Sequence, residues 1–348
     1  MNDIDRFTQL DPQDMRGHID GLPSQLESGW ELGMNQPLPD GPRPKMVILA
    51  GMGGSAIGAD LAAAYLGPSF PIPLIVWRGY ELPASAGPEA LVILSSHSGN
   101  TEETLSAYDA ARRSRARLLA ITTGGELARR CDHEGLPAWR FEHRGQPRAA
   151  VGFSFALILA ALHRVGLAEE AWGEIQAAAE AMRLQQHDLR AETPVARNPA
   201  RRMAGQFLDR FPLIIAGGLL APVARRWRTQ IAEVAKAVAQ FEELPEADHN
   251  MVAGVDHPES LITRTMAVFL RASLDSPRLA ARVEATRHIL MVEGFNTDVI
   301  EAAGATRLAQ QWTCLHYGDY VAYYLAMAYG VDPTPVAAIE ELKSRLRG

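Results

Sequence analysis

The chain has 348 residues and a formal net charge of −7 at pH 7, and its length suits two domains of ordinary size. Hydrophobic residues make up 47% and charged residues 22%, which is the usual mixture for a globular protein with a large core. The acidic balance argues against broad nucleic-acid binding, although a helix N-terminus can still hold a small anion.

No targeting or membrane segment is expected. The first residues, MNDIDRFTQLDPQDM, are polar and acidic, so they do not resemble a signal peptide. No apolar run reaches the roughly 18 residues of a membrane span. The two cysteines, Cys131 and Cys314, fit neither a disulfide framework nor a zinc site, and we expect reduced, buried thiols in a cytoplasmic protein.

The N-terminal segment is predicted to be helical over residues 1 to about 30, because apolar residues recur every three or four positions from Leu10 to Leu26. The proline-rich stretch 34–45 predicts an irregular connection. We therefore assign residues 1–44 to an N-terminal helical segment and linker.

Strand and helix patterns alternate after this segment. Helices are expected over 101–114, 277–294 and 307–330, and residues 151–210 are mostly helical. Continuous apolar runs predict strands buried on both faces; they lie at 46–51, 73–77, 90–95, 117–123 and 211–218. A further strand is expected at 296–302. The pattern predicts an α/β fold with two related lobes, each a parallel sheet covered by helices.

Two features of the first lobe indicate a phosphate site. The glycine-rich turn GMGGS (51–55) follows the first strand, where open α/β sheets bind ligands. The turn SSHSGNTEET (95–104) follows a later strand and precedes a helix, where free backbone amides and the helix dipole favour an anion. We expect Asn100 and Glu103 to form a capping box.

A dinucleotide site is an alternative explanation, since GMGGSA fits the pattern G-x-G-x-x-A. A site for NAD expects an acidic residue at the end of the second strand, which instead ends in Trp77 and Arg78. Arg78 leaves a site for NADP open. A helix cap without a ligand is the other alternative.

The segments GMGGSAIG and SSHSGNTEET resemble the paired phosphate-binding segments of the sugar isomerase (SIS) domain. The segments QPRAAVGFS, PVARRWRTQIAEVAK, ELPEADHN and DPTPVAAIEELKSRL resemble the bifunctional phosphoglucose/phosphomannose isomerases of the phosphoglucose isomerase superfamily. This resemblance implies two SIS-type, doubly wound parallel-sheet lobes, each a three-layer αβα sandwich. It places a phosphate-binding domain at 45–165 and a domain with the catalytic glutamate and histidine at 166–348.

The resemblance also implies site residues. Glu233 falls on the position of the glutamate base, His249 on the ring-opening histidine, Arg148 on the arginine beside the reacting oxygens and Lys343 on a lysine near the substrate. The phosphate-binding positions fall on Gly53, Gly54, Ser55, Ser96, Ser98 and Thr101. Such enzymes are commonly homodimers in which the histidine comes from the neighbouring subunit. Here Val234 follows the glutamate and Asp248 precedes the histidine, where many relatives have asparagine.

These groups suit aldose–ketose isomerisation of glucose 6-phosphate and/or mannose 6-phosphate to fructose 6-phosphate. A carboxylate such as Glu233 can carry a proton between two carbons through a cis-enediolate, a histidine suits ring opening, and Arg148 can stabilise the anion. By position alone, Glu233 is an exposed helical glutamate paired with Lys236, and His249 is a surface histidine. No metal or cofactor is expected. A non-catalytic sugar-phosphate sensor and an SIS isomerase of amino-sugar phosphates remain alternatives.

Overall fold

A computed structural model describes residues 4–347 and divides the chain into two compact units. The first-sheet unit contains Gly21–Arg183 and Gly304–Trp312; the second-sheet unit contains Leu184–Ala303 and the described parts of Met1–Asp20 and Thr313–Gly348. The units therefore interleave along the chain, whereas the sequence prediction used three contiguous segments, 1–44, 45–165 and 166–348. That division stays a prediction.

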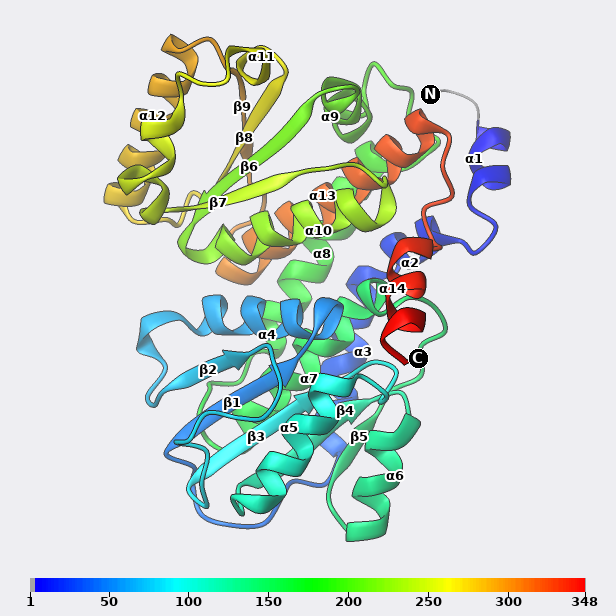
Figure 1. Ribbon diagram of the computed structural model, residues 1–348, viewed down its shortest axis with the longest axis vertical. Helices are drawn as coiled ribbons and strands as arrows, with labels where there is room; N and C mark the ends of the chain where they lie inside the picture. Colours follow the sequence, from blue (N-terminus) through cyan, green and yellow to red (C-terminus); the bar gives the residue numbers. More distant parts are fainter. Residues whose placement is uncertain (1–3, 348) are drawn as a thin grey trace. The chain divides into compact units, whose positions relative to one another are not determined.

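The first-sheet unit is built on a five-stranded parallel sheet in the order β2-β1-β3-β4-β5 (Figure 1). Its strands are β1 (Met46–Gly51), β2 (Leu74–Trp77), β3 (Ala90–Ser95), β4 (Arg117–Thr122) and β5 (Ala138–Arg140). The first four strands match the predicted apolar runs. The three residues of β5 contain a single fully buried side chain, that of Trp139, and this is too short a pattern to identify a strand.

Helices pack against both faces of this sheet. Ile48, Ala50, Val92 and Leu94 share one face and form a core with α5 (Glu102–Arg113) and α6 (Gly125–Glu134). The residues that alternate with these along the strands, such as Leu49, face the other side of the sheet and are also buried. Strands buried on both faces are expected from continuous apolar runs. The other helices of this unit are α3 (Leu22–Asn35), α4 (Gly53–Leu66) and α7 (Val151–Arg164), and α4 packs against β1 and β2.

The second-sheet unit is built on a four-stranded parallel sheet in the order β7-β6-β8-β9. Leu213, Ile215, Ala267 and Phe269 share one face and form a core with α12 (Pro277–Val292). The strands are β6 (Phe211–Gly217), β7 (Gln240–Leu244), β8 (Thr265–Arg271) and β9 (Asn296–Glu301). The sequence QFEEL of β7 lacks an apolar run, so this edge strand was not predicted.

Helices lie in the predicted segments at the N-terminus and at 151–210, 277–294 and 307–330. The N-terminal segment forms α1 (Ile4–Leu10) and α2 (Met15–Asp20) before α3. Others are α8 (Trp172–Leu189), α9 (Pro199–Phe207), α10 (Ala221–Val234), α11 (Glu259–Ile262), α13 (Arg307–Tyr329) and α14 (Ala337–Arg347). The predicted α/β class with two parallel sheets and a helical N-terminal segment is therefore confirmed. Among residues 4–347, every helix is too short or too polar to cross a bilayer.

Helix α13 contains a buried histidine. His316 is fully buried, and its Nε2 donates a hydrogen bond to the carbonyl of Ile19 at 2.9 Å. Its Nδ1 has no hydrogen-bond partner among the described residues. Burial lowers the pKa of His316 to about 4, because a proton on Nδ1 would place an unpaired charge in the core.

We predict that acid destabilises the protein through His316. The unfolded chain binds this proton below a pKa of about 6.5, whereas the folded chain binds it only below about 4, so stability is lost as the pH falls through this interval. The full loss is about 3 kcal/mol. Urea unfolding at pH 7 and pH 4.5 measures it, and His316→Gln, which keeps an N–H donor for Ile19, should lose less stability than the wild type. Equal losses in the wild type, His316→Gln and the exposed-histidine control His187→Gln would contradict this assignment.

Candidate functional site

The strand order of the first sheet places two loops side by side. After β1 the chain crosses to β2 on one side, and after β3 it crosses to β4 on the other side, so the strand order reverses between β1 and β3. The last residues of these strands, Gly51 and Ser95, are paired in register. Crevices at such reversal points are where open α/β sheets bind ligands.

Hydrogen bonds join the predicted phosphate-binding residues of these loops. Ser55 Oγ accepts a hydrogen bond from the backbone amide of His97 at 3.2 Å. Ser96 Oγ and Thr101 Oγ1 lie 2.9 Å apart, within hydrogen-bond distance. Ser98 Oγ accepts a hydrogen bond from the amide of Asn100 at 3.2 Å. The structure therefore pairs the hydroxyls of Ser96 and Thr101 and ties Ser55 to the loop that follows β3, while Ser98 bonds within that loop.

Two helices begin at these loops without a side-chain cap. Helix α4 has Met52 as its N-cap residue and α5 has Thr101, and neither side chain accepts a hydrogen bond from its helix. The predicted capping box of Asn100 and Glu103 is wrong, because Asn100 Oδ1 accepts a hydrogen bond from the amide of Glu126 at 2.9 Å. Uncapped helix starts leave backbone amides available to an anion.

Glycines allow the close approach of backbones around these loops. A side chain at Gly99, whose φ is +66°, would place its Cβ 1.9 Å from the carbonyl oxygen of Gly124. At Gly54 a Cβ would lie 2.7 Å from the carbonyl group of Pro147 and 2.8 Å from the amide nitrogen of Arg148. Distances below 3.0 Å are not tolerated by real Cβ atoms, so both positions require glycine for steric reasons.

Because Gly54 has no side chain, the backbone of Arg148 can lie beside the glycine-rich loop. Arg148 belongs to the short helix η2 (Pro147–Ala150), and 3% of its surface is exposed. The contact between Gly54 and the backbone of Arg148 brings the predicted arginine to the same end of the sheet as the turn 95–104, which we call the serine loop. One compact unit therefore contains the predicted phosphate-binding residues together with Arg148.

The other predicted residues belong to the second-sheet unit. Glu233 is the penultimate residue of α10 and is half-buried. The helix is anchored by an ion pair in which Arg226 contacts Asp319 at 2.7 Å and both side chains are 1% exposed. Lys236 Nζ donates a hydrogen bond to the backbone carbonyl of Glu233 at 2.6 Å. Because α10 returns from β6 to the start of β7, Glu233 lies at the end of the helix remote from the glycines that follow β6.

His249 lies in a loop that is fixed through its neighbour. It ends the short helix η4 (Glu246–His249), and its side chain is exposed. Both carboxylate oxygens of Asp248 are engaged by α12: Oδ2 contacts Arg282 at 2.6 Å and Oδ1 accepts a hydrogen bond from Thr286 at 2.6 Å. The role of Asp248 is not visible in the sequence, where it is only a departure from relatives, because its partners are 34 and 38 residues away in the chain.

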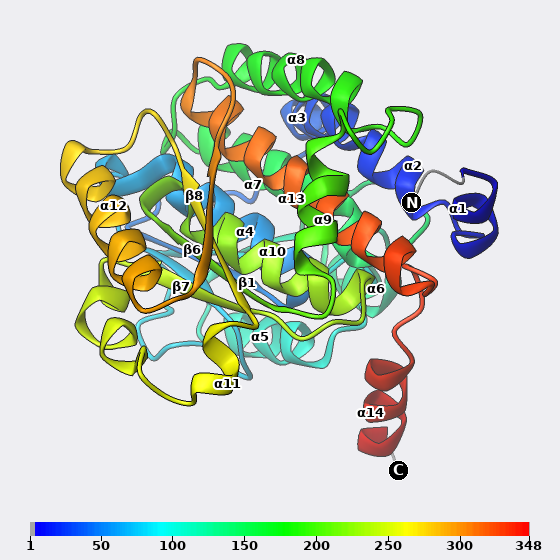
Figure 2. The ribbon, with the colours of Figure 1, turned by 90° about the horizontal axis from the view of Figure 1, so that it is seen from above.

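Lys343 lies on α14, whose side chains from Ala337 to Leu346 are all exposed. Figure 2 shows this helix apart from the other elements of its unit. Glu233, His249 and Lys343 therefore come from three separate elements, and the contacts described above do not join them. Their assembly into one site stays a prediction.

Arg78, which left an NADP site open, has a partner on α4. Its guanidinium contacts the carboxylate of Asp60 and donates a hydrogen bond to the carbonyl of Ala56 at 3.3 Å. The described residues also contain no group of three or more His, Cys, Asp or Glu side chains arranged to hold a metal ion.

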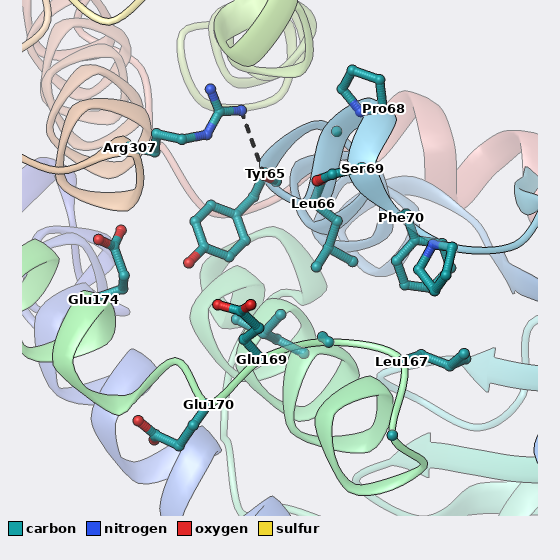
Figure 3. Close-up of a pocket in the computed structure, with 15 residues that line it drawn as sticks. Tyr65, Leu66, Pro68, Ser69, Phe70, Leu167, Glu169, Glu170, Glu174 and Arg307 are labelled. Carbon is teal, nitrogen blue, oxygen red and sulfur yellow. Dashed lines mark hydrogen bonds between the residues drawn. The ribbon is translucent and has the colours of Figure 1, made fainter.

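A cavity of about 880 Å³ lies elsewhere in the first-sheet unit (Figure 3). It is lined by the end of α4, the loop after α7 and Arg307. None of the predicted phosphate-binding residues lines it. Its wall contains Glu169, Glu170 and Glu174, and these carboxylates would repel a phosphate dianion.

We predict that Gly54→Ala disrupts the glycine-rich loop (51–55) and the serine loop (95–104), which together are called the phosphate loops below. The new Cβ would contact the backbone of Pro147 and Arg148, and such overpacking typically costs about 1–3 kcal/mol. Thermal unfolding should show the lower stability, and calorimetric titration with inorganic phosphate should show weaker binding. Gly173→Ala is the control, because a Cβ at this helical position of the same unit meets open space. Equal stability and equal phosphate binding in both variants would contradict this account of Gly54.

Comparisons with known proteins identify the fold and the family of this chain. Residues 196–346 match the model of the bacterial phospho-glucose isomerase C-terminal SIS domain. A solved structure of a hypothetical protein from Thermus thermophilus superposes with a TM-score of 0.75 at 17% identity, covering 98% of this chain and 91% of that one, and this shows a shared fold.

Two curated relatives are named bifunctional phosphoglucose/phosphomannose isomerase. The protein from Caldicellulosiruptor bescii is 36% identical over 329 residues, which cover 93% of this chain and 96% of that protein. The protein from Aquifex aeolicus is 32% identical over 304 residues, which cover 87% of this chain and 91% of that protein. With this identity over nearly the whole length, the chain belongs to the bifunctional phosphoglucose/phosphomannose isomerase family.

Proposed function

We propose that this protein is an isomerase that interconverts glucose 6-phosphate and/or mannose 6-phosphate with fructose 6-phosphate. The observation that carries the proposal is the convergence of Ser55, Ser96, Thr101 and Arg148 at the carboxyl ends of β1 and β3. This convergence occurs in a chain whose relatives are named for isomerisation of these two sugar phosphates.

The first-sheet unit supplies groups that suit a phosphate monoester. Hydroxyls of Ser55, Ser96, Ser98 and Thr101 can donate to phosphate oxygens, and two uncapped helix starts add backbone amides. In our proposal these groups, with Gly53 and Gly54, hold the phosphate that lies remote from the reacting carbons. Binding energy from such a remote group can position the reacting carbons against the catalytic base.

Glu233 is the proposed base. Moving the carbonyl between C1 and C2 requires a proton to leave one carbon and return to the other through a cis-enediolate. A carboxylate at the end of α10 suits this transfer, because the buried pair of Arg226 and Asp319 fixes the helix that bears it. Arg148 would stabilise the negative charge of the enediolate, and Lys343 would lie near the substrate.

His249 is the proposed ring-opening group. It would transfer a proton between the C1 hydroxyl and the ring oxygen, which an imidazole can do near neutral pH. Its loop is fixed to α12 by both carboxylate oxygens of Asp248, while the imidazole itself is exposed. This combination suits a residue that acts on a substrate outside its own unit.

We infer a homodimer in which His249 completes the site of the neighbouring subunit. Helix α14 supports this inference, because its apolar residues Ile339, Leu342 and Leu346 lie on one helical face and are 39%, 56% and 74% exposed. A second copy of the chain would cover such a face.

The buried, unbridged thiols of Cys131 and Cys314 support a location in the reducing cytoplasm.

We predict that Glu233→Gln lowers kcat about 100-fold or more for whichever of the two aldose phosphates the wild type converts. The amide keeps the shape of the side chain but cannot accept the proton. Formation of fructose 6-phosphate is measured with EDTA present, which should leave wild-type turnover unchanged. The exposed glutamate variant Glu180→Gln is the control and should retain full activity.

Wild-type turnover in Glu233→Gln would remove this residue as the base. Tight binding of both aldose phosphates by the wild type without turnover would favour a sugar-phosphate sensor.

We predict that mixing two inactive variants restores activity if His249 acts in the partner's site. In a heterodimer of Glu233→Gln and His249→Ala, one site has both wild-type groups and the other has neither. After refolding an equimolar mixture, about a quarter of all sites should be active for random pairing in a two-fold dimer. An activity no greater than that of the separate variants would place His249 in its own subunit's site.

A further inference from the structure

The phosphate loop contains a histidine whose side chain is not needed for the proposed chemistry. His97 lies between Ser96 and Ser98 and is half-buried. Its backbone amide donates to Ser55 Oγ at 3.2 Å, and its carbonyl accepts hydrogen bonds from the amide and hydroxyl of Thr123 at 3.0 and 2.7 Å. The backbone of His97 therefore connects the serine loop to the glycine-rich loop and to the end of β4.

The imidazole of His97 makes a second connection. His97 Nε2 and His143 Nδ1 lie 2.9 Å apart and share a hydrogen bond in which one nitrogen donates and the other accepts. The two rings are nearly perpendicular, with an interplanar angle of 82° and a centroid separation of 5.1 Å. Burial lowers the pKa of His97, which favours the neutral form that such a pair of imidazoles requires.

Aromatic side chains restrict both histidines. Phe141 contacts the His97 ring edge-on, with centroids 5.9 Å apart, and Phe153 of α7 contacts the His143 ring in the same manner at 6.4 Å. Phe141 and Phe153 stack on each other with centroids 5.1 Å apart. Rings that are held on several sides have little freedom to rotate, so the hydrogen bond joins two fixed groups.

His143 precedes the segment that bears Arg148. Only Arg144 to Pro147 separate these two residues, and Pro147 and Arg148 themselves contact Gly54 of the glycine-rich loop. The segment from His143 to Arg148 is thus attached to the phosphate loops at both ends. The attachment at Arg148 is a backbone contact, while the attachment at His143 is the hydrogen bond to His97.

We propose that His143 is a positioning residue, whose hydrogen bond to His97 fixes the serine loop and the segment that bears Arg148 relative to each other. Phosphate binding by Ser96, Ser98 and Thr101 and charge stabilisation by Arg148 then depend on the same hydrogen bond. This inference rests on the proposed function for the role of Arg148. The link between His143 and the phosphate loop does not depend on that role.

Two variants of His143 separate the hydrogen bond from the packing. His143→Phe keeps an aromatic ring against Phe153 but removes the ring nitrogen. His143→Asn loses the ring but keeps an amide group where Nδ1 lies, so it can still bond to His97. The exposed histidine variant His133→Asn is the control in the same unit.

Steady-state kinetics with the aldose phosphate that the wild type converts gives the main test. We expect His143→Phe to raise KM about three- to tenfold, the size of one net hydrogen bond, and to lower kcat as well. His143→Asn should recover most of both losses. In the Arg148→Gln background, His143→Phe should lower kcat no further, since the group that it positions is absent.

Three results would overturn the proposal. If His143→Phe raises KM but leaves kcat unchanged, His143 does not act on Arg148. If His143→Asn loses as much as His143→Phe, packing and not the hydrogen bond is responsible. If the fold-losses in kcat of His143→Phe and Arg148→Gln multiply when both substitutions are combined, the two residues act independently.

Calorimetric titration with inorganic phosphate separates a failure of this proposal from a failure of the proposed function. Without any wild-type turnover the proposed function fails, but weaker phosphate binding in His143→Phe, by about three- to tenfold, would still support the link to the loop. Equal phosphate affinity in the wild type, His143→Phe and His143→Asn would overturn it.

Discussion

The close approach of backbones at the carboxyl ends of β1 and β3 is the constraint on which the candidate site depends. Gly51 and Ser95 end paired strands, and the chain leaves them in opposite directions, so the two following loops must share one crevice. The missing side chain at Gly54 admits the backbone of Pro147 and Arg148 to the same place. The backbone of Arg148 thereby lies against a loop of this crevice.

In our proposal, the first-sheet unit binds the phosphate and the second-sheet unit carries the base. The helix starts after β1 and β3 are uncapped, and hydroxyl side chains surround them. The turn after β6 has the same strand–glycine–helix order, but leads into Leu219 and Leu220. The second-sheet unit thus lacks hydroxyls at its equivalent turn and contributes, in our proposal, the far end of α10. This difference in side chains is our reason for assigning phosphate binding to the first-sheet unit alone.

Much of this arrangement could be predicted from sequence because its signals are local. The apolar runs of β1, β3 and β4 and the glycines and serines that follow them are contiguous in the chain. The side-chain contacts that the sequence does not reveal are long-range. His97 meets His143 across 46 positions, and Asn100 bonds to Glu126 instead of capping its own helix. Strands β5 and β7 were not predicted, because β5 is too short and β7 is too polar to form an apolar run.

The central claim is that the serine loop and the Glu233 carboxylate act on one sugar phosphate. A crystal structure of the assembled protein with fructose 6-phosphate bound tests it most directly. The account predicts the phosphate against Ser96, Ser98 and Thr101, with a Glu233 carboxylate oxygen about 3–3.5 Å from C1 or C2 of the sugar. A phosphate bound elsewhere, or a Glu233 carboxylate out of reach of both carbons in every subunit, would contradict the account.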